Sequence, residues 1–83
     1  MIIVQYYTRS GCHLCEIMLE ELLPLVRGRV NVEICDIDSR PEWDEKYGTR
    51  VPVIEFKGKL VGEYPLDHGA IRRFLARAPE NAE

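Results

Sequence analysis

The sequence predicts an α/β domain with the element order β-α-β-α-β-β-α and a four-stranded mixed sheet in the order 2-1-3-4, flanked by helices. Three observations support this prediction. A strand, an amphipathic helix and a second strand follow one another within about 37 residues, and such units are parallel and right-handed. A hairpin signal and a last amphipathic helix come later in the chain. The uninterrupted apolar character of the first strand places it inside the sheet.

The first strand and helix are indicated by two different hydrophobic patterns. Residues 2–7, IIVQYY, are mostly apolar, β-branched or aromatic, and they predict a strand buried on both faces. Residues 8–11 form a turn, and the apolar positions from Leu14 onward follow an i, i+3, i+4 series. This series predicts an amphipathic helix that begins near Cys12 and is kinked or ended by Pro24.

The second strand follows a glycine that closes the helix. Gly28 has the place of a helix C-terminal glycine. Residues 30–37, VNVEICDI, alternate in character, which places Ile34 on one face of the strand and Cys35 on the other. Cys35 is interpreted as a small packing residue of this strand rather than as a third redox centre.

A short second helix is predicted from its start and stop signals. Ser39 and Glu42, three residues apart, fit a capping box, and Pro41 suits the first turn. The helix should run through residues 43–47 and stop at Gly48.

The remaining elements are a hairpin and a final helix. Residues 51–56, VPVIEF, and 59–64, KLVGEY, predict two strands joined by a turn at 57–58. Asp67 should cap the last helix, which has a clear apolar face.

Length and charge restrict the classes of function. The 83 residues suit one domain at 1–78 followed by a frayed tail at 79–83. The net charge is −3, with both signs interspersed, which argues against a nucleic-acid partner. No apolar run is long enough for a membrane span, and the N-terminus does not resemble a signal peptide. We therefore expect a cytoplasmic monomer that binds neither nucleic acid nor membrane.

The motif with chemical content is Cys12-His13-Leu14-Cys15. Cys12 falls at the predicted helix start, where free N–H groups and a partial positive charge favour a thiolate. Cys15 lies one turn inside the helix and should be more buried. This asymmetry suits thiol–disulfide exchange, in which Cys12 attacks a substrate disulfide and Cys15 resolves the mixed disulfide. Arg9 and His13 could add positive charge, although His13 could equally be a merely exposed residue.

Two other interpretations of the cysteine pair remain open. One is a metal or iron–sulfur carrier, although zinc prefers four ligands and the sequence shows no second Cys-x-x-Cys or His-x-x-x-His pattern. The other is a partner-binding domain that has the fold without turnover. A stable structural disulfide is disfavoured in a reducing cytoplasm, and three cysteines cannot all pair within one chain.

Over essentially its whole length the chain resembles the short glutaredoxin-like proteins of the thioredoxin-fold superfamily. YTRSGCHLC, residues 7–15, is similar to the family pattern around Cys-x-x-Cys, and RVP, residues 50–52, is similar to the TVP segment that carries the superfamily's cis-proline. The resemblance implies a thioredoxin fold and a thiol–disulfide oxidoreductase. It also implies that Pro52 is cis and packs against the cysteine pair, leaving the N–H and C=O of Val51 free to pair with an extended substrate.

The resemblance further implies substrate-binding roles, with some departures from the family pattern. Arg9 and Arg50 are candidates to hold a carboxylate of glutathione, Gly62 stands alone where the family has two glycines, and Asp67 is the candidate for contacting the glutathione amine. His13 belongs to a dipeptide that is typically Pro-Tyr in the family. We expect protein disulfides as substrates, no tightly bound cofactor and no metal, with glutathione or a thioredoxin-reductase-type donor as candidate reductants.

Overall fold

The computed structural model describes residues 2–77, so the predicted tail at 79–83 lies outside the described residues. The elements within this range follow the predicted order, with one additional 3₁₀ turn. In chain order they are β1 (Ile2–Thr8), α1 (His13–Val26), β2 (Val30–Asp36), the 3₁₀ turn η1 (Ile37–Ser39), α2 (Pro41–Tyr47), β3 (Val53–Phe56), β4 (Lys59–Glu63) and α3 (His68–Arg77).

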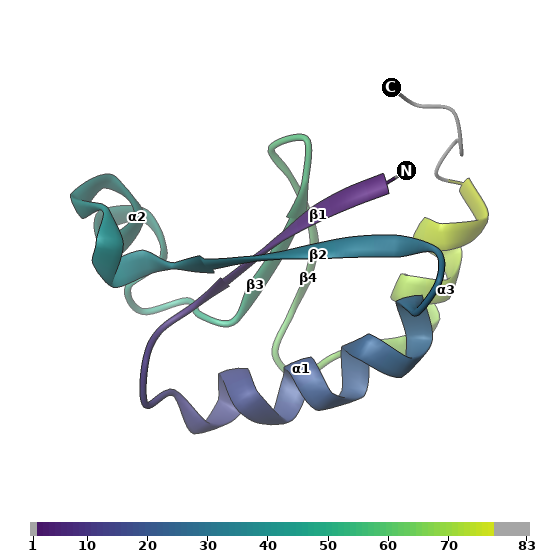
Figure 1. Cartoon of the computed structure of the whole chain (residues 1–83), viewed down its shortest axis with the longest axis horizontal. Coiled ribbons are helices and arrows are strands. Elements are labelled where there is room, and N and C mark those ends of the chain that lie inside the picture. Colours follow the sequence, from purple (N-terminus) through teal and green to yellow (C-terminus); the bar gives the residue numbers. More distant parts are fainter. Residues whose placement is uncertain (1, 78–83) are drawn as a thin grey trace.

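The strands of residues 2–77 form one mixed sheet in the order β2-β1-β3-β4, which confirms the predicted fold class (Figure 1). β1 pairs with β2 in parallel and with β3 in antiparallel fashion. The β3–β4 hairpin has a register shift between Ile54 and Glu55, and its turn has positive φ angles at Lys57 and Gly58. None of the helices in this range is long and apolar enough to cross a membrane.

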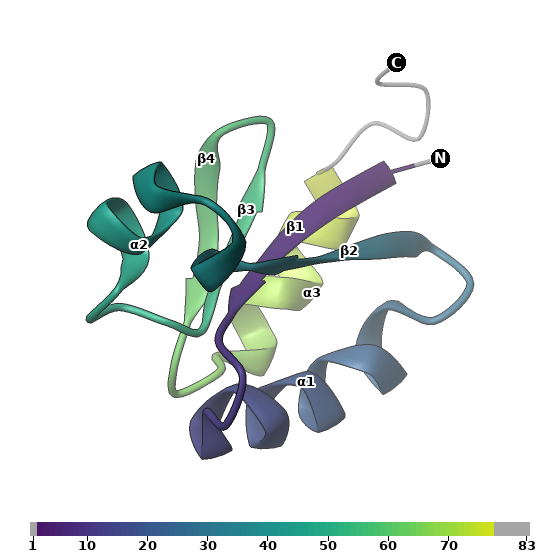
Figure 2. The same ribbon diagram turned by 60° about the vertical axis from the view of Figure 1, so that its left-hand side comes forward.

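The larger core lies between the sheet and the two helices α1 and α3, which cover the same face (Figures 1 and 2). Alternate residues of β1 point to this face because successive side chains of a strand project to opposite sides. The buried members of this core are Ile2, Val4, Tyr6, Met18, Leu22, Val26, Ile54, Ile71 and Leu75.

The opposite face of the sheet is covered at one end by η1 and α2. The buried members of this second cluster are Tyr7, Cys35, Ile37, Tyr47 and Val53. The rings of Tyr7 and Tyr47 are stacked with their centroids 4.1 Å apart. The end of β1 is thus packed from both sides, by Tyr6 on one face and Tyr7 on the other, and this is where the chain turns into α1.

The burial prediction for β1 is wrong, and the end of β2 has an exposure that the sequence did not indicate. β1 is not buried on both faces along its length, because Ile3 is 48% exposed where η1 and α2 do not reach. In β2, Ile34 is 54% exposed whereas Cys35 is buried. Alternation still holds, since Ile34 pairs with Tyr6 on the α1 face, but Ile34 lies near the end of an edge strand that no neighbour covers.

The helix α1 continues past Pro24 and ends at Val26, so Pro24 lies near the end of the helix as predicted, and a kink there stays a prediction. The second helix differs from its prediction. The capping box is absent, because Arg40 rather than Ser39 is the N-cap of α2 and makes no side-chain cap. Ser39 belongs to η1, where its hydroxyl donates to the carbonyl of Asp36 at 2.6 Å. Pro41 is at the helix start as predicted.

Candidate redox site

A tight turn delivers Cys12 to the start of α1. The Cys12 N–H donates to the carbonyl of Arg9 at 3.1 Å, and Gly11 has a φ of 80°, a left-handed conformation that glycine adopts without strain. Cys12 is the N-cap of α1, and its carbonyl accepts the N–H of Glu16 at 3.2 Å. The prediction that the helix begins near Cys12 is therefore confirmed.

Cys12 and Cys15 form a disulfide, with their Cα atoms 5.2 Å apart. Cys15 is only 2% exposed, whereas Cys12 is partly exposed. The backbone N–H of Cys15 donates to Cys12 Sγ at 3.1 Å. The first turn of the helix thus supplies a donor to the more accessible sulfur, as expected for a sulfur at a helix N-terminus.

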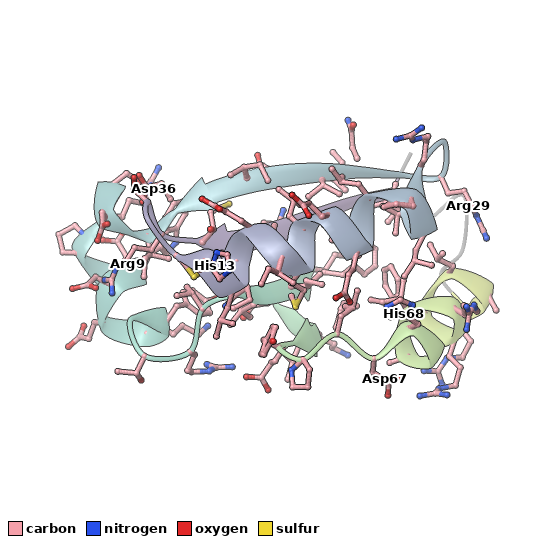
Figure 3. All side chains as sticks on the ribbon, turned by 90° about the horizontal axis from the view of Figure 1, so that it is seen from below. Arg9, His13, Arg29, Asp36, Asp67 and His68 are labelled. Atoms are coloured by element: carbon pink, nitrogen blue, oxygen red, sulfur yellow. A yellow bond between two sulfur atoms is a disulfide. The ribbon has the colours of Figure 1, made fainter. Side chains whose placement is uncertain are left out.

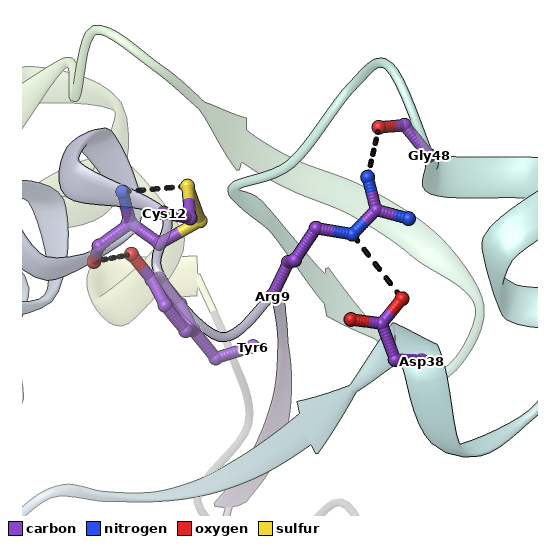
Figure 4. The surroundings of a disulfide bond; sticks show 6 residues. Tyr6, Arg9, Cys12, Asp38 and Gly48 are labelled. Carbon is purple, nitrogen blue, oxygen red and sulfur yellow. Dashed lines mark hydrogen bonds and ion pairs between the residues drawn. A yellow bond between two sulfur atoms is a disulfide. The ribbon is translucent and has the colours of Figure 1, made fainter.

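Tyr6 holds the first turn of α1 against the sheet. Its hydroxyl donates to the carbonyl of Cys15 at 2.7 Å, and the side chain is fully buried (Figure 4). Burial raises the pKa of Tyr6, so the hydroxyl remains a donor at neutral pH. The apolar pattern of residues 2–7 predicted that Tyr6 is buried, but no sequence signal indicated this hydrogen bond.

The side chain of Arg9 points away from the two sulfurs (Figure 4). It forms ion pairs with Asp38 and Asp44, and a hydrogen bond with the carbonyl of Gly48. The sequence did not indicate these partners. The positive charge of Arg9 is offset by two carboxylates, which weakens the expected contribution of this residue to a thiolate at Cys12.

The segment before β3 carries Val51 and Pro52. The peptide bond between them is cis, as is the Tyr64–Pro65 bond, which the sequence did not indicate. Pro52 is fully buried. The prediction that the Val51 N–H is free for substrate is wrong, because it donates to the carbonyl of Tyr47 at 3.1 Å. The end of α2 therefore takes this donor.

Arg50 and Gly62 are both engaged by neighbouring residues. Arg50 is paired with Glu63 at 3.9 Å. Gly62 lies in β4, where an added Cβ would meet Ile54 at 3.5 Å and Ile71 at 3.9 Å. A Cβ at Gly62 would therefore make ordinary van der Waals contacts with apolar side chains of the core.

His13 and Asp67 lie far apart along the molecule. His13 is the exposed first residue of α1, next to Cys12 (Figure 3). Asp67 accepts the N–H of Ala70 at 3.1 Å, which confirms its capping role, and the adjacent His68 contacts Glu21 of α1. Glu21 is about 9 Å along the helix from Cys15. The structure therefore does not place Asp67 beside the cysteine pair.

Cys35 is a free thiol on the opposite face of the sheet, 6% exposed. Burial raises the pKa of this thiol, the negative charge of Glu33 adds to the effect, and Arg40 partly opposes it. A buried thiol in its neutral form is unreactive, which fits a packing residue. In the part of the chain that the structure describes, no three His, Cys, Asp or Glu side chains gather in a way that could hold a metal ion.

The model of the family described as Glutaredoxin-like domain (DUF836) matches residues 3–76. This chain belongs to that family. A glutaredoxin-like domain is thus shown, built on a thioredoxin fold with a Cys12–Cys15 pair in disulfide geometry. A search of curated proteins gave no match to it.

Solved structures show the same fold. The glutaredoxin-like domain is similar to a structural-genomics target protein, XcR50, from X. campestris, with a TM-score of 0.72 and 30% identity over 92% of this chain and 99% of that chain. Thioredoxin 1 from Thermosipho africanus has a TM-score of 0.61 and 18% identity, covering 90% and 96% of the two chains. Mitochondrial thioredoxin 3 from Saccharomyces cerevisiae, in its oxidized form, has a TM-score of 0.57 and 22% identity, covering 89% and 76%. The two thioredoxins support the fold alone.

Proposed function

We propose that this glutaredoxin-like domain is a thiol–disulfide oxidoreductase that exchanges a dithiol for a disulfide through Cys12 and Cys15. The observation that carries the proposal is the asymmetry of the pair. Cys12 is the more accessible sulfur and accepts the Cys15 N–H at 3.1 Å, whereas Cys15 is 2% exposed. A thiolate is the reactive form of cysteine, and this donor favours it at Cys12.

The reaction proceeds in two exchanges that balance. The Cys12 thiolate attacks one sulfur of a substrate disulfide, forms a mixed disulfide and releases the other substrate sulfur as a thiolate, which takes up a proton. Cys15 then loses its proton and attacks Cys12 Sγ, which forms the Cys12–Cys15 disulfide and releases the second substrate thiol. Two electrons pass from the domain to the substrate, and an external thiol donor, glutathione or a reductase, restores the dithiol.

Protein disulfides are the proposed substrates, in a reducing compartment such as the cytoplasm. Because the Val51 N–H is engaged, the Val51 carbonyl is the remaining backbone group through which an extended substrate would pair beside Cys12. The exposed side chains of His13 and Leu14 would flank the attacked disulfide. The proposed active species is a monomer.

The test is disulfide reduction by the pre-reduced domain, measured on insulin and beside it in a glutathione-coupled assay. Cys12→Ser should abolish exchange, and Cys15→Ser should accumulate a mixed disulfide because the resolving thiol is gone. Cys35→Ala is the matched control and should retain exchange, since Cys35 lies on the other face. If the wild type reduces neither substrate faster than Cys12→Ser does, the proposal fails, and iron or zinc in the purified protein would favour a metal carrier instead.

A further inference from the structure

We propose that Arg9 is a positioning residue, which clamps the turn before Cys12 to the segment that leads into Val51 and Pro52. This proposal rests on the proposed disulfide exchange and specifies how the substrate-binding edge is held next to the attacking sulfur. It gives Arg9 a role different from the glutathione-carboxylate contact that the family resemblance implied.

The guanidinium of Arg9 contacts groups from η1, α2 and the residue that follows α2. Its Nε donates to Asp38 Oδ1 at 3.2 Å, and its Nη1 donates to the carbonyl of Gly48 at 3.3 Å. Its Nη2 is paired with Asp44 Oδ1. A planar fork with several fixed donors is suited to hold such groups in one relative arrangement.

The backbone of Arg9 makes the second half of the clamp. Its carbonyl accepts the Cys12 N–H at 3.1 Å, so the residue fixes the turn that presents Cys12. At the other end, Gly48 begins the segment that leads to Pro52, and the N–H groups of Arg50 and Val51 both donate to the carbonyl of Tyr47. Arg9 therefore joins the two segments between which an extended substrate would lie.

The same contacts make Arg9 a poor receptor for a third carboxylate. Three of its five N–H donors are engaged, and two of the acceptors are carboxylates. An incoming carboxylate would meet the negative charges of Asp38 and Asp44 at short range, which is unfavourable. The side chain is 35% exposed and is directed away from the sulfurs (Figure 4).

Arg9→Gln tests the clamp through two measured rates, that of peptide disulfide exchange and that of Cys12 alkylation. If Arg9 acted through its charge on the thiolate, both rates would fall together. Exchange with a neutral peptide disulfide should fall by about tenfold or more, because small misplacements of a binding edge have large effects on rate. The rate of Cys12 alkylation at neutral pH should stay at the wild-type value, since the Cys15 N–H remains in place. Arg9→Lys should restore part of the exchange, because a lysine can pair with one carboxylate but cannot reach all three groups.

Arg40→Gln is the matched control. Arg40 is an exposed arginine whose side chain pairs with Glu42 at 3.7 Å and lies over the Trp43 ring, both within its own helix region. The Arg40→Gln substitution removes one positive charge, as Arg9→Gln does, and should leave the rate of peptide disulfide exchange unchanged.

Several outcomes would overturn the clamp. Wild-type peptide exchange in Arg9→Gln is one, and a parallel loss of alkylation is another. A loss confined to glutathione-dependent turnover, with a raised KM for glutathione, would make Arg9 a carboxylate ligand. If the wild type shows no disulfide exchange, the proposed function fails. Amide hydrogen–deuterium exchange then tests separately whether Arg9 holds the two segments together. The Arg50 and Val51 amides should exchange faster in Arg9→Gln than in the wild type, and unchanged protection would refute the inference.

Discussion

Replacing Cys15 with alanine separates two groups that are able to hold Cys12 as a thiolate in the reduced protein. One is the backbone N–H of Cys15, which lies 3.1 Å from Cys12 Sγ. The other is the thiol of Cys15. The substitution removes the thiol and keeps the N–H. Because the structure shows the N–H in contact with the sulfur, we expect the Cys15→Ala variant to retain a reactive, largely ionised Cys12.

The size of the effect follows from this contact and from the helix start. A hydrogen bond to a charged acceptor stabilises it by about 1.5–3 kcal/mol, and the helix dipole contributes about 0.3–1 kcal/mol. Even a total of about 2 kcal/mol raises the ionisation constant of a thiol roughly 30-fold. An ordinary cysteine is about 3% ionised at pH 7, so about half of the Cys12 side chains should carry charge there.

The assay follows thiolate absorbance and the alkylation rate of reduced Cys15→Ala across neutral pH. His13→Gln, in a background that keeps both cysteines, tests whether the exposed imidazole contributes. Cys12→Ala leaves Cys15, whose thiol should ionise less readily than an ordinary cysteine because it is buried. If Cys12 in Cys15→Ala ionised like an ordinary cysteine, the backbone donor would not be the cause and the reasoning would be refuted.

Three further predictions concern the framework of the site. Burial raises the pKa of Tyr6 and Tyr47, so the unfolded chain loses these protons first and the free energy of unfolding should fall as the pH rises above about 10. In urea titrations at several pH values, Tyr6→Phe should reduce the slope of this free energy against pH by about 1.4 kcal/mol per pH unit. An unchanged slope would contradict the assignment. Met18→Ala should lower the free energy of unfolding by about 2–5 kcal/mol, because Met18 is a fully buried residue on the core-facing side of α1. Gly11→Ala should cost about 1–2 kcal/mol through its left-handed φ, whereas Ser10→Ala in the same turn should cost little.

The fold was predictable from the sequence because its signals are local. The strand and helix patterns of IIVQYY and of the segment after Leu14 each depend on neighbours within a few residues, and a βαβ unit then has one handedness. The misplaced cap at Ser39 shows the limit of such signals. The same residue types favour N-caps and 3₁₀ turns, and here the hydroxyl bonds to Asp36 instead of to the helix.

Part of the site was also local and could be predicted, whereas the contacts made at long range could not. Cys12 at the helix start follows from the turn and the helix pattern alone. The partners of Arg9 lie 29, 35 and 39 residues away, so the sequence could show an arginine near the cysteines but not where its side chain goes. The engagement of the Val51 N–H likewise depends on how the end of α2 is placed against the sheet.

The two consecutive tyrosines of β1 connect the halves of the site to opposite faces of the sheet. Tyr6 points to the α1 face, where its hydroxyl holds the carbonyl of Cys15. Tyr7 points to the other face, where its ring stacks on Tyr47, whose carbonyl accepts the Val51 N–H. Since both tyrosines belong to the same interior strand, β1 positions both the attacking sulfur and the proposed substrate edge. Arg9 lies just beyond the end of β1, where the sheet no longer fixes the distance between the Cys12 turn and the segment that leads to Pro52. Its hydrogen bond to the carbonyl of Gly48 connects these two segments directly.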